Sequence, residues 1–283
     1  MPELPEVETT RRGIQASIQN QIINSVTIRN SRLRWPVDLK LSELMHGFEI
    51  KSVERRSKYL LLKAENKQQY QRTLIIHLGM SGSIHIVLVS AKQVPQKHDH
   101  IDIKFENGII LRYRDPRRFG AVLWCDGNPL EHSLLTNLGP EPLTSDFEVD
   151  TFYQASRSKK QTIKQYIMDA KNVVGVGNIY ANEALFLSKI RPGRAAGRVS
   201  LKEFKRLHKN IIQVLSKAIA KGGTTLKDFV APNQESNKAE AGYFQQELFV
   251  YGRANLPCQI CTNTIKQKMI SKRNSFYCPN CQH

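Results

Sequence analysis

Hydrophobic and polar positions divide the 283-residue chain into segments of different periodicity. Over residues 4–20 the apolar side chains recur at the spacing of one helix face, at Leu4, Val7, Ile14 and Ile18. Over residues 22–125 they alternate with polar residues or form β-branched runs, and "ENG" between two such runs predicts a hairpin. Several strands at close spacing favour a sandwich or a barrel.

The second half of the chain has a different pattern. Helical spacing returns over residues 131–222, where "SLKEFKRLHKNIIQVLSKAIAKGG" carries a serine N-cap and a glycine stop. Residues 231–243 are small and polar without periodicity, which indicates a loop of functional length. A short cysteine-bearing module follows. We therefore expect three parts, at residues 1–130, 131–244 and 245–283.

The charge balance indicates a polyanionic partner. The chain has 42 Lys and Arg against 25 Asp and Glu, a net charge of +17. Such an excess favours nucleic acid or an anionic membrane surface. No apolar run approaches the ~20 residues of a membrane span, and no signal peptide is visible. We therefore expect a cytoplasmic protein, with nucleic acid as the better candidate and no membrane partner.

Four of the five cysteines lie in the last 26 residues. They form two C-x2-C pairs, and two such pairs can complete a tetrahedron around one zinc ion at Cys258, Cys261, Cys278 and Cys281. Four thiolates leave no open position, so this zinc would be structural; free thiols or a redox pair are the alternative. The hairpin between the pairs is basic, which indicates phosphate contacts or simply a solvated face, at Lys266, Lys268, Lys272 and Arg273. The fifth cysteine, Cys125, is expected in the core.

The opening "MPELPEVE" has two interpretations. Pro2 beside Glu3 and Glu6 suits the first turn of a helix, where proline and acidic residues are favoured. Alternatively, removal of Met1 would expose a secondary amine. An amine can act as a nucleophile and form a Schiff base, and the α-amino pKa of roughly 8 leaves it partly neutral at cellular pH.

Three further motifs have both a functional and a structural interpretation. The glycines of "VVGVGNIYANEALF" (173–186) precede a helix predicted to be amphipathic, and their amides either cradle a phosphate or form a plain turn. The basic run "SRSKKQTIK" is a candidate clamp for a nucleic-acid backbone, through Arg157, Lys159, Lys160 and Lys164. The turns of "HLGMSG" and "RYRDPRRFGAV" present Met80, Arg117 and Phe119 either as a wedge for a DNA duplex or as core.

The motifs "PELPEVE", "HLGMSG", "DPRRFG" and "GVGNIYANE", followed by the four-cysteine module, make the whole chain resemble the formamidopyrimidine-DNA glycosylase family. The resemblance implies an α+β multidomain fold. This fold has an N-terminal helix with an antiparallel β-sandwich, a helix–two-turns–helix domain and a C-terminal β-hairpin zinc finger. It also implies a monomer that excises oxidised purines from damaged double-stranded DNA and then cleaves the strand. Related enzymes that prefer oxidised pyrimidines usually begin Pro-Glu-Gly-Pro-Glu, so Leu4 favours the purine branch.

The same resemblance implies roles for individual residues. Pro2 corresponds to the nucleophile, Glu3 to the acid–base carboxylate with Glu6 in support, Lys58 to a proton donor, and Arg273 to the residue for phosphate binding and the second elimination. The residues that fill the space of the flipped base would be Met80, Arg117 and Phe119, with His98, Lys159 and Asn178 on the DNA backbone. The resemblance also implies one structural zinc per chain and a loop at 231–243 that covers the lesion. The alternative from another class is a non-catalytic zinc-ribbon protein that binds DNA.

Overall fold

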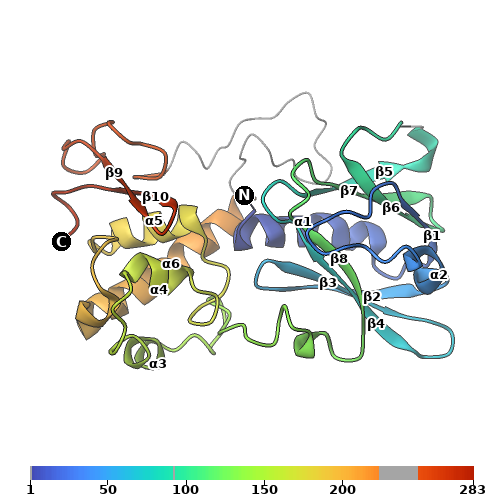
Figure 1. Ribbon diagram of the computed structural model, residues 1–283, viewed down its shortest axis with the longest axis horizontal. Helices are drawn as coiled ribbons and strands as arrows, with labels where there is room; N and C mark the ends of the chain where they lie inside the picture. The colour runs from blue at the N-terminus through green and yellow to red at the C-terminus, as the bar shows by residue number, and fades with distance from the viewer. Residues whose placement is uncertain (1, 92, 223–247) are drawn as a thin grey trace. The chain divides into compact units, whose positions relative to one another are not determined.

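The computed structural model describes residues 2–91, 93–222 and 248–283 (Figure 1). The loop predicted at 231–243 therefore lies outside the described residues. The chain forms two compact units: Glu6–Thr136 belongs to the first, and Glu3–Pro5 belongs to the second together with the described residues from Asn137 onward.

The first unit contains two four-stranded antiparallel sheets, as the resemblance implies (Figure 1). One sheet has the order β1 (Ile23–Ile28), β6 (Asp99–Phe105), β7 (Ile109–Arg114) and β5 (Ser83–Leu88). The other has the order β2 (Glu49–Arg56), β3 (Tyr59–Glu65), β4 (Gln71–His77) and β8 (Ala121–Asp126). The predicted "ENG" hairpin is confirmed, because β6 and β7 pair around Gly108, whose φ is +79°.

One hydrophobic core joins both sheets of the first unit to helix α1 (Leu4–Ile18). Val7, Ile14 and Ile18 are fully buried in it, which confirms the predicted helix face. The short helix α2 (Leu41–Met45) was not predicted, because five residues are too few to show a helical period. The prediction that Cys125 is a core residue is wrong: it is only half-buried near the end of β8, where burial raises the pKa of its thiol.

The second unit is helical, with a hairpin near the C-terminus. Its helices and strands are α3 (Val149–Gln154), α4 (Ile163–Met168), α5 (Asn178–Leu187), α6 (Leu201–Ala220), β9 (Lys266–Ile270) and β10 (Arg273–Tyr277). Helix α6 begins at the expected cap, where Ser200 and Glu203 form a capping box. Helix α5 differs from its prediction, since all residues from Ile179 to Phe186 are buried and leave no solvent-facing side there.

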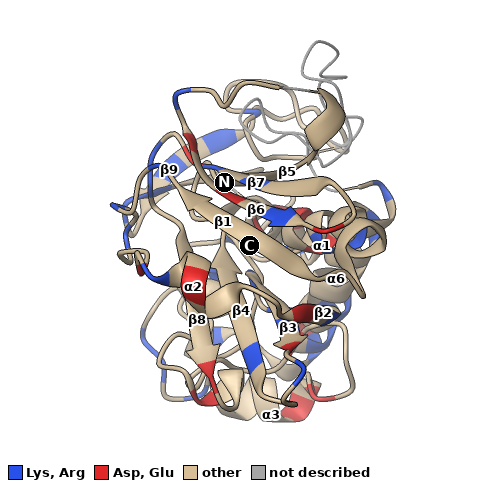
Figure 2. Cartoon of the chain, turned by 90° about the vertical axis from the view of Figure 1, so that its right-hand side faces the viewer, with Lys and Arg blue, Asp and Glu red and all other residues tan. Residues whose placement is uncertain are grey.

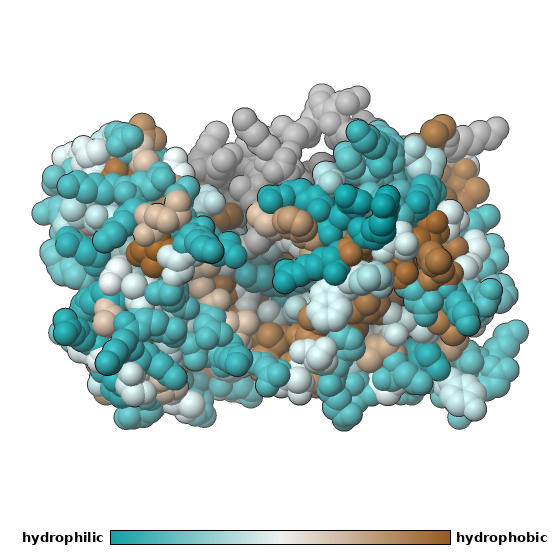
Figure 3. All heavy atoms as spheres, in the orientation of Figure 1, coloured by the Kyte–Doolittle hydropathy of each residue, from teal (hydrophilic) through white to brown (hydrophobic). Residues whose placement is uncertain are grey.

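Charged residues lie in the connections as well as on the strands (Figure 2). Lys266 and Lys268 on β9 are exposed. Most atoms on the face drawn in Figure 3 belong to hydrophilic residues, which agrees with the large net charge. Among the helices of the described residues, none is both long enough and apolar enough to cross a membrane.

Candidate active site and nucleic-acid interface

The carboxylate of Glu3 lies at the N-terminus of α5. It accepts hydrogen bonds from the backbone N–H groups of Ile179 (3.0 Å) and Tyr180 (3.4 Å), and it is 1% exposed. A helix N-terminus favours a negative charge, so this position stabilises an ionised carboxylate. The prediction that the amides of this turn bind a phosphate is therefore wrong for Ile179 and Tyr180, because their N–H groups already donate to Glu3.

The glycines of the turn before α5 allow this approach. A Cβ atom on Gly177 would lie 2.0 Å from Cδ of Glu3, and one on Gly175, whose φ is +80°, would lie 2.2 Å from Cδ1 of Leu4. The Leu4 N–H also donates to the Gly175 carbonyl at 3.3 Å. Two glycines at this spacing are thus a local signal for close approach of another segment, although the sequence does not say which one.

The residues at the start of the chain are buried, including the acidic ones. Pro2 is buried, and Glu6 is 0% exposed. Sequence reasoning missed Glu8, which binds Arg11 and Arg55. Burial raises the pKa of Glu8, but hydrogen bonds from the neighbouring arginines outweigh it and bring the pKa below its ordinary value. The signal that could have found it is its i,i+3 spacing to Arg11.

Lys58 lies in the two-residue turn that joins β2 to β3. The turn is tight because Arg56 pairs with Tyr59, and Ser57 before Lys58 adopts a φ of +57°. Lys58 itself is half-buried. Burial, and then the positive charge of Lys58, lowers the pKa of His77 to about 4, so His77 is neutral at physiological pH beside a cationic lysine.

The two turns that carry Met80, Arg117 and Phe119 lie together in the first unit. A cavity of about 610 Å³ is lined there by Arg32, Leu33, Arg34, Arg117, Arg118 and Phe119. Phe119 is 42% exposed, and the Arg117 guanidinium lies 4.9 Å from its ring centroid, so the core interpretation is wrong for Phe119. Met80 is half-buried. Sequence reasoning missed the other three arginines of this lining. Arg32 and Arg34 belong to the basic cluster "RLRWP", and Arg118 belongs to the "DPRRFG" turn itself.

His98 lies beside the same turns. It is half-buried, and its carbonyl accepts the N–H of Asp115 at 3.1 Å. Its ring centroid is 6.4 Å from that of the buried His100. The structure therefore brings His98 and the DPRRFG turn together within the first unit.

The second unit divides the predicted basic clamp into an exposed part and a buried part. Lys159 and Lys160 are exposed. Arg157 instead donates to backbone carbonyls, including those of Gly197 and Val199, so its assignment to the clamp is wrong. A guanidinium with several local carbonyl acceptors stabilises the fold rather than a ligand.

The prediction that Lys164 belongs to the clamp is also wrong, because this residue is only 1% exposed. Its Nζ donates to the Asn274 carbonyl (2.8 Å) and to Ser275 Oγ (2.7 Å). Burial, and then the nearby charge of Arg273, lowers its pKa to about 7. The Asn178 side chain donates to the same Asn274 carbonyl at 3.1 Å, whereas Arg273, one residue earlier, is exposed.

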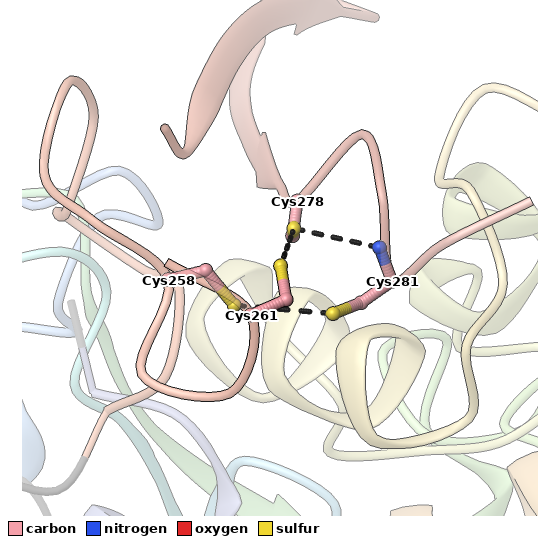
Figure 4. A group of neighbouring side chains, drawn as sticks. All are labelled: Cys258, Cys261, Cys278 and Cys281. Carbon is pink, nitrogen blue, oxygen red and sulfur yellow. Dashed lines mark hydrogen bonds between the residues drawn. The ribbon is translucent and has the colours of Figure 1, made fainter. Parts of the chain in front are cut away.

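The four cysteines of the C-terminal module point toward one another (Figure 4). Their sulfur atoms all lie within 4.8 Å of each other, with 3.4 Å between Cys261 and Cys278 and 4.0 Å between Cys258 and Cys281. Zinc–sulfur bonds of ~2.3 Å in a tetrahedron require sulfur atoms about 3.8 Å apart. The residues therefore fit a metal ion with four thiolate ligands.

Helix α5 holds the cysteine module through buried polar groups. The Glu183 carboxylate accepts the N–H groups of Phe249 (2.8 Å), Val250 (3.0 Å) and Tyr251 (2.9 Å). Asn182 Oδ1 accepts the N–H of Phe276 at 2.8 Å. The Glu183 bonds fasten the segment before the first cysteine pair, and the Asn182 bond fastens strand β10 of the hairpin, to the helix whose N-terminus holds Glu3.

The fold and the site together define a class: a two-unit protein with a β-sandwich, a helix–two-turns–helix region and a four-cysteine hairpin. The model of the formamidopyrimidine-DNA glycosylase N-terminal domain matches residues 1–122, and the model of the H2TH domain of the same family matches residues 138–230. The chain therefore belongs to the formamidopyrimidine-DNA glycosylase family.

Individual relatives agree over the whole length. The chain is 51% identical to the formamidopyrimidine-DNA glycosylase of Hydrogenovibrio crunogenus, covering 100% of this chain and 96% of the relative. It is also 51% identical to that of Thioalkalivibrio sulfidiphilus, covering 100% of both. Among solved structures, the MutM (Fpg) protein of Thermus thermophilus superposes with a TM-score of 0.85 at 33% identity, covering 99% of this chain and 98% of that one. A complex between Lactococcus lactis Fpg and Fapy-dG-containing DNA gives a TM-score of 0.87 at 32% identity, covering 99% and 100%.

Proposed function

We propose that this chain removes oxidised purine bases from duplex DNA and then cleaves the strand at the resulting abasic site. Membership of the glycosylase family supports the reaction class. Solved relatives from Lactococcus lactis are bound to DNA that contains Fapy-dG and to DNA that contains an abasic site. These are a substrate and an intermediate of the proposed reaction.

The nucleophile in this proposal is the secondary amine of Pro2 after removal of Met1. It attacks C1′ of the damaged nucleotide, the bond to the base breaks, and an iminium ion links the protein to the sugar. The iminium acidifies the C2′ proton, so elimination of the 3′-phosphate follows. Glu3 and Lys58 move the protons, with Glu6 in support. Arg273 assists a second elimination, so that the strand is cleaved by β,δ-elimination.

The position of the Glu3 carboxylate is the observation that carries the proposal. It is held by two backbone N–H groups of α5 and is adjacent in sequence to Pro2. A general acid or base has to be held near the reacting atoms, and hydrogen bonds from a helix N-terminus provide such an anchor.

The DNA contacts follow the same family pattern. Met80, Arg117 and Phe119 would fill the space of the flipped base, with Arg117 reading the opposite cytosine. Contacts to the DNA backbone would come from His98, Lys159, Asn178 and Arg273. The exposure of Arg117 and Phe119 supports the first assignment, and that of Lys159 and Arg273 supports the second.

The metal in this proposal is one structural zinc per chain, held by Cys258, Cys261, Cys278 and Cys281. It would fix the hairpin that carries Arg273 and would take no part in bond making. The proposed division of the chain has a catalytic domain at 1–130, a helix–two-turns–helix domain at 131–244 and a zinc module at 245–283. The protein would act as a monomer on DNA in the cytoplasm.

Borohydride trapping on an 8-oxoguanine duplex tests the proposal. Reduction should yield one covalent protein–DNA adduct whose peptide map ends at Pro2, whereas an undamaged duplex should yield none. A non-catalytic DNA-binding protein would give no adduct with either duplex. An adduct that maps to a lysine would refute the assignment of Pro2.

A further inference from the structure

The buried carboxylate of Asp115 lies between the two turns that carry the proposed wedge residues. It is 0% exposed and accepts hydrogen bonds from Ser81 Oγ (2.7 Å), Gly120 N (2.9 Å), Arg117 N (3.2 Å) and Tyr113 Oη (3.2 Å). The bond to Arg117 closes an Asx-turn inside one loop. The bond to Ser81 reaches the other loop, 34 residues earlier in the chain.

The backbones of the two turns touch at this point. A Cβ atom on Gly79 would lie 2.5 Å from the carbonyl carbon of Phe119 and 2.6 Å from the nitrogen of Gly120. A Cβ atom on Gly120 would lie 2.4 Å from the His77 carbonyl oxygen. Neither turn can therefore shift toward the other, and their separation depends on the bonds that hold them together.

The backbone of Asp115 is also held from outside the turns. Its N–H donates to the His98 carbonyl at 3.1 Å, and its carbonyl oxygen is 2.8 Å from Nε2 of His100. Ser81 Oγ additionally accepts the N–H of Arg117 at 3.1 Å. The Ser81 hydroxyl is thus bonded both to the carboxylate and to the backbone of the residue proposed to read the opposite base.

We propose that Ser81 and Asp115 are positioning residues that fix Met80, Arg117 and Phe119 as one unit for readout of the base opposite the lesion. This inference rests on the proposed function. The residues that enter the duplex are exposed or half-buried and receive little support from packing, so their direction depends on the turn backbone beneath them. A bidentate base contact specifies only when its donor is held in the right place, whereas a phosphate contact tolerates displacement. Loss of the Ser81 hydroxyl should therefore weaken discrimination between opposite bases more than it weakens binding to DNA in general.

The test compares Ser81→Ala and Asp115→Asn with Ser83→Ala. Ser83 is a matched control, because its buried hydroxyl also has a hydrogen-bond partner, 2.9 Å away on His85, but that partner lies on strand β5 rather than in either turn. Two quantities are measured with each of the four bases opposite the lesion. They are the single-turnover excision of 8-oxoguanine and the affinity for a duplex with a non-reactive abasic-site analogue. Thermal unfolding is measured in parallel.

For Ser81→Ala we expect the preference for cytosine over the other bases to fall about three- to tenfold, the effect of one net hydrogen bond. Ser83→Ala should keep the wild-type preference. Two results would overturn the inference and leave Ser81 a purely structural residue. One is an equal loss of excision and affinity with all four opposite bases, and the other is an unchanged preference for cytosine with a lower melting temperature. If Asp115→Asn does not fold, Ser81→Ala still decides. Wild-type protein that binds with a cytosine preference but excises nothing would refute the proposed function, and the affinities would still decide the inference.

Discussion

Replacing Gly177 with alanine should misplace the Glu3 carboxylate without removing it. The new Cβ atom would lie 2.0 Å from Cδ of Glu3 and 2.3 and 2.5 Å from its two oxygens. Backbone atoms fix the position of this Cβ, so the carboxylate must move away. It would then leave the N–H groups of Ile179 and Tyr180.

The size of the effect follows from these distances. Carbon atoms in contact settle ~3.5–4.0 Å apart, so the carboxylate has to retreat by about 1.5 Å. A displacement of ~1 Å of a catalytic group can cost ~10²-fold in rate. The two lost bonds involve a charged acceptor, which is worth ~1.5–3 kcal/mol for each. We therefore expect Gly177→Ala to excise 8-oxoguanine at least ~100-fold more slowly than the wild type.

The assay is single-turnover excision with borohydride trapping, beside thermal unfolding. Gly193→Ala is the matched control in the same unit, since its Cβ atom would meet only Cδ1 of Ile270 at 3.9 Å, an ordinary contact. Glu3→Gln measures the loss of the acid itself and should be at least as slow as Gly177→Ala. A folded Gly177→Ala protein with wild-type excision would refute the reasoning, because the carboxylate could then act from elsewhere.

Three further predictions follow from other parts of the molecule. Elemental analysis should find one zinc per wild-type chain and none in Cys278→Ser, whose β-sandwich should stay folded, and full metal content in this variant would contradict the ligand assignment. Glu203 pairs with Arg194 at 2.6 and 2.8 Å, and this hydrogen bonding lowers its pKa to about 2. The lowered pKa stabilises the fold above pH ~4.5, so Glu203→Gln should lower the free energy of unfolding, measured with urea at pH 7, by ~1–3 kcal/mol. This difference between variant and wild type should shrink as the pH falls toward 2, and a difference that does not change with pH would refute the prediction. Arg117→Ala should reduce the preference for cytosine opposite the lesion by ~1–3 kcal/mol. Arg273→Ala should instead weaken DNA binding equally for all four opposite bases and lower the salt dependence of the affinity by about one phosphate contact. If both variants behave alike, the distinction between a base contact and a phosphate contact is refuted.

Local sequence patterns were sufficient to predict much of the fold. The serine cap of α6, the hairpin at Gly108 and the first helix are each specified by residues close in sequence. The metal site is similar, because each C-x2-C pair brings two sulfurs together through its own turn, and one hairpin then joins the pairs. Such features depend little on the rest of the chain, and so the sequence alone predicts them.

Features that depend on distant partners were not predictable in this way. The carboxylate of Glu3 and the amide of Ile179 are separated by 176 residues, and only the folded chain brings them together. The same holds for Glu183, whose three backbone donors lie more than sixty residues later. A buried carboxylate needs such donors, but a sequence does not show which backbone groups will be left without a partner.

The basic run "SRSKKQTIK" shows how this limit affects a functional interpretation. Charge alone suggested one surface, yet Lys159 faces solvent whereas Lys164 points inward to the strand that carries Arg273. Because Lys164 and Asn178 both donate to the Asn274 carbonyl, the backbone next to Arg273 is held from inside the protein. A long arginine side chain that starts from a fixed backbone loses less conformational freedom when it binds a phosphate. In the proposed function, Lys164 would therefore serve DNA binding indirectly, because it fixes the backbone beside Arg273 and does not itself face the solvent.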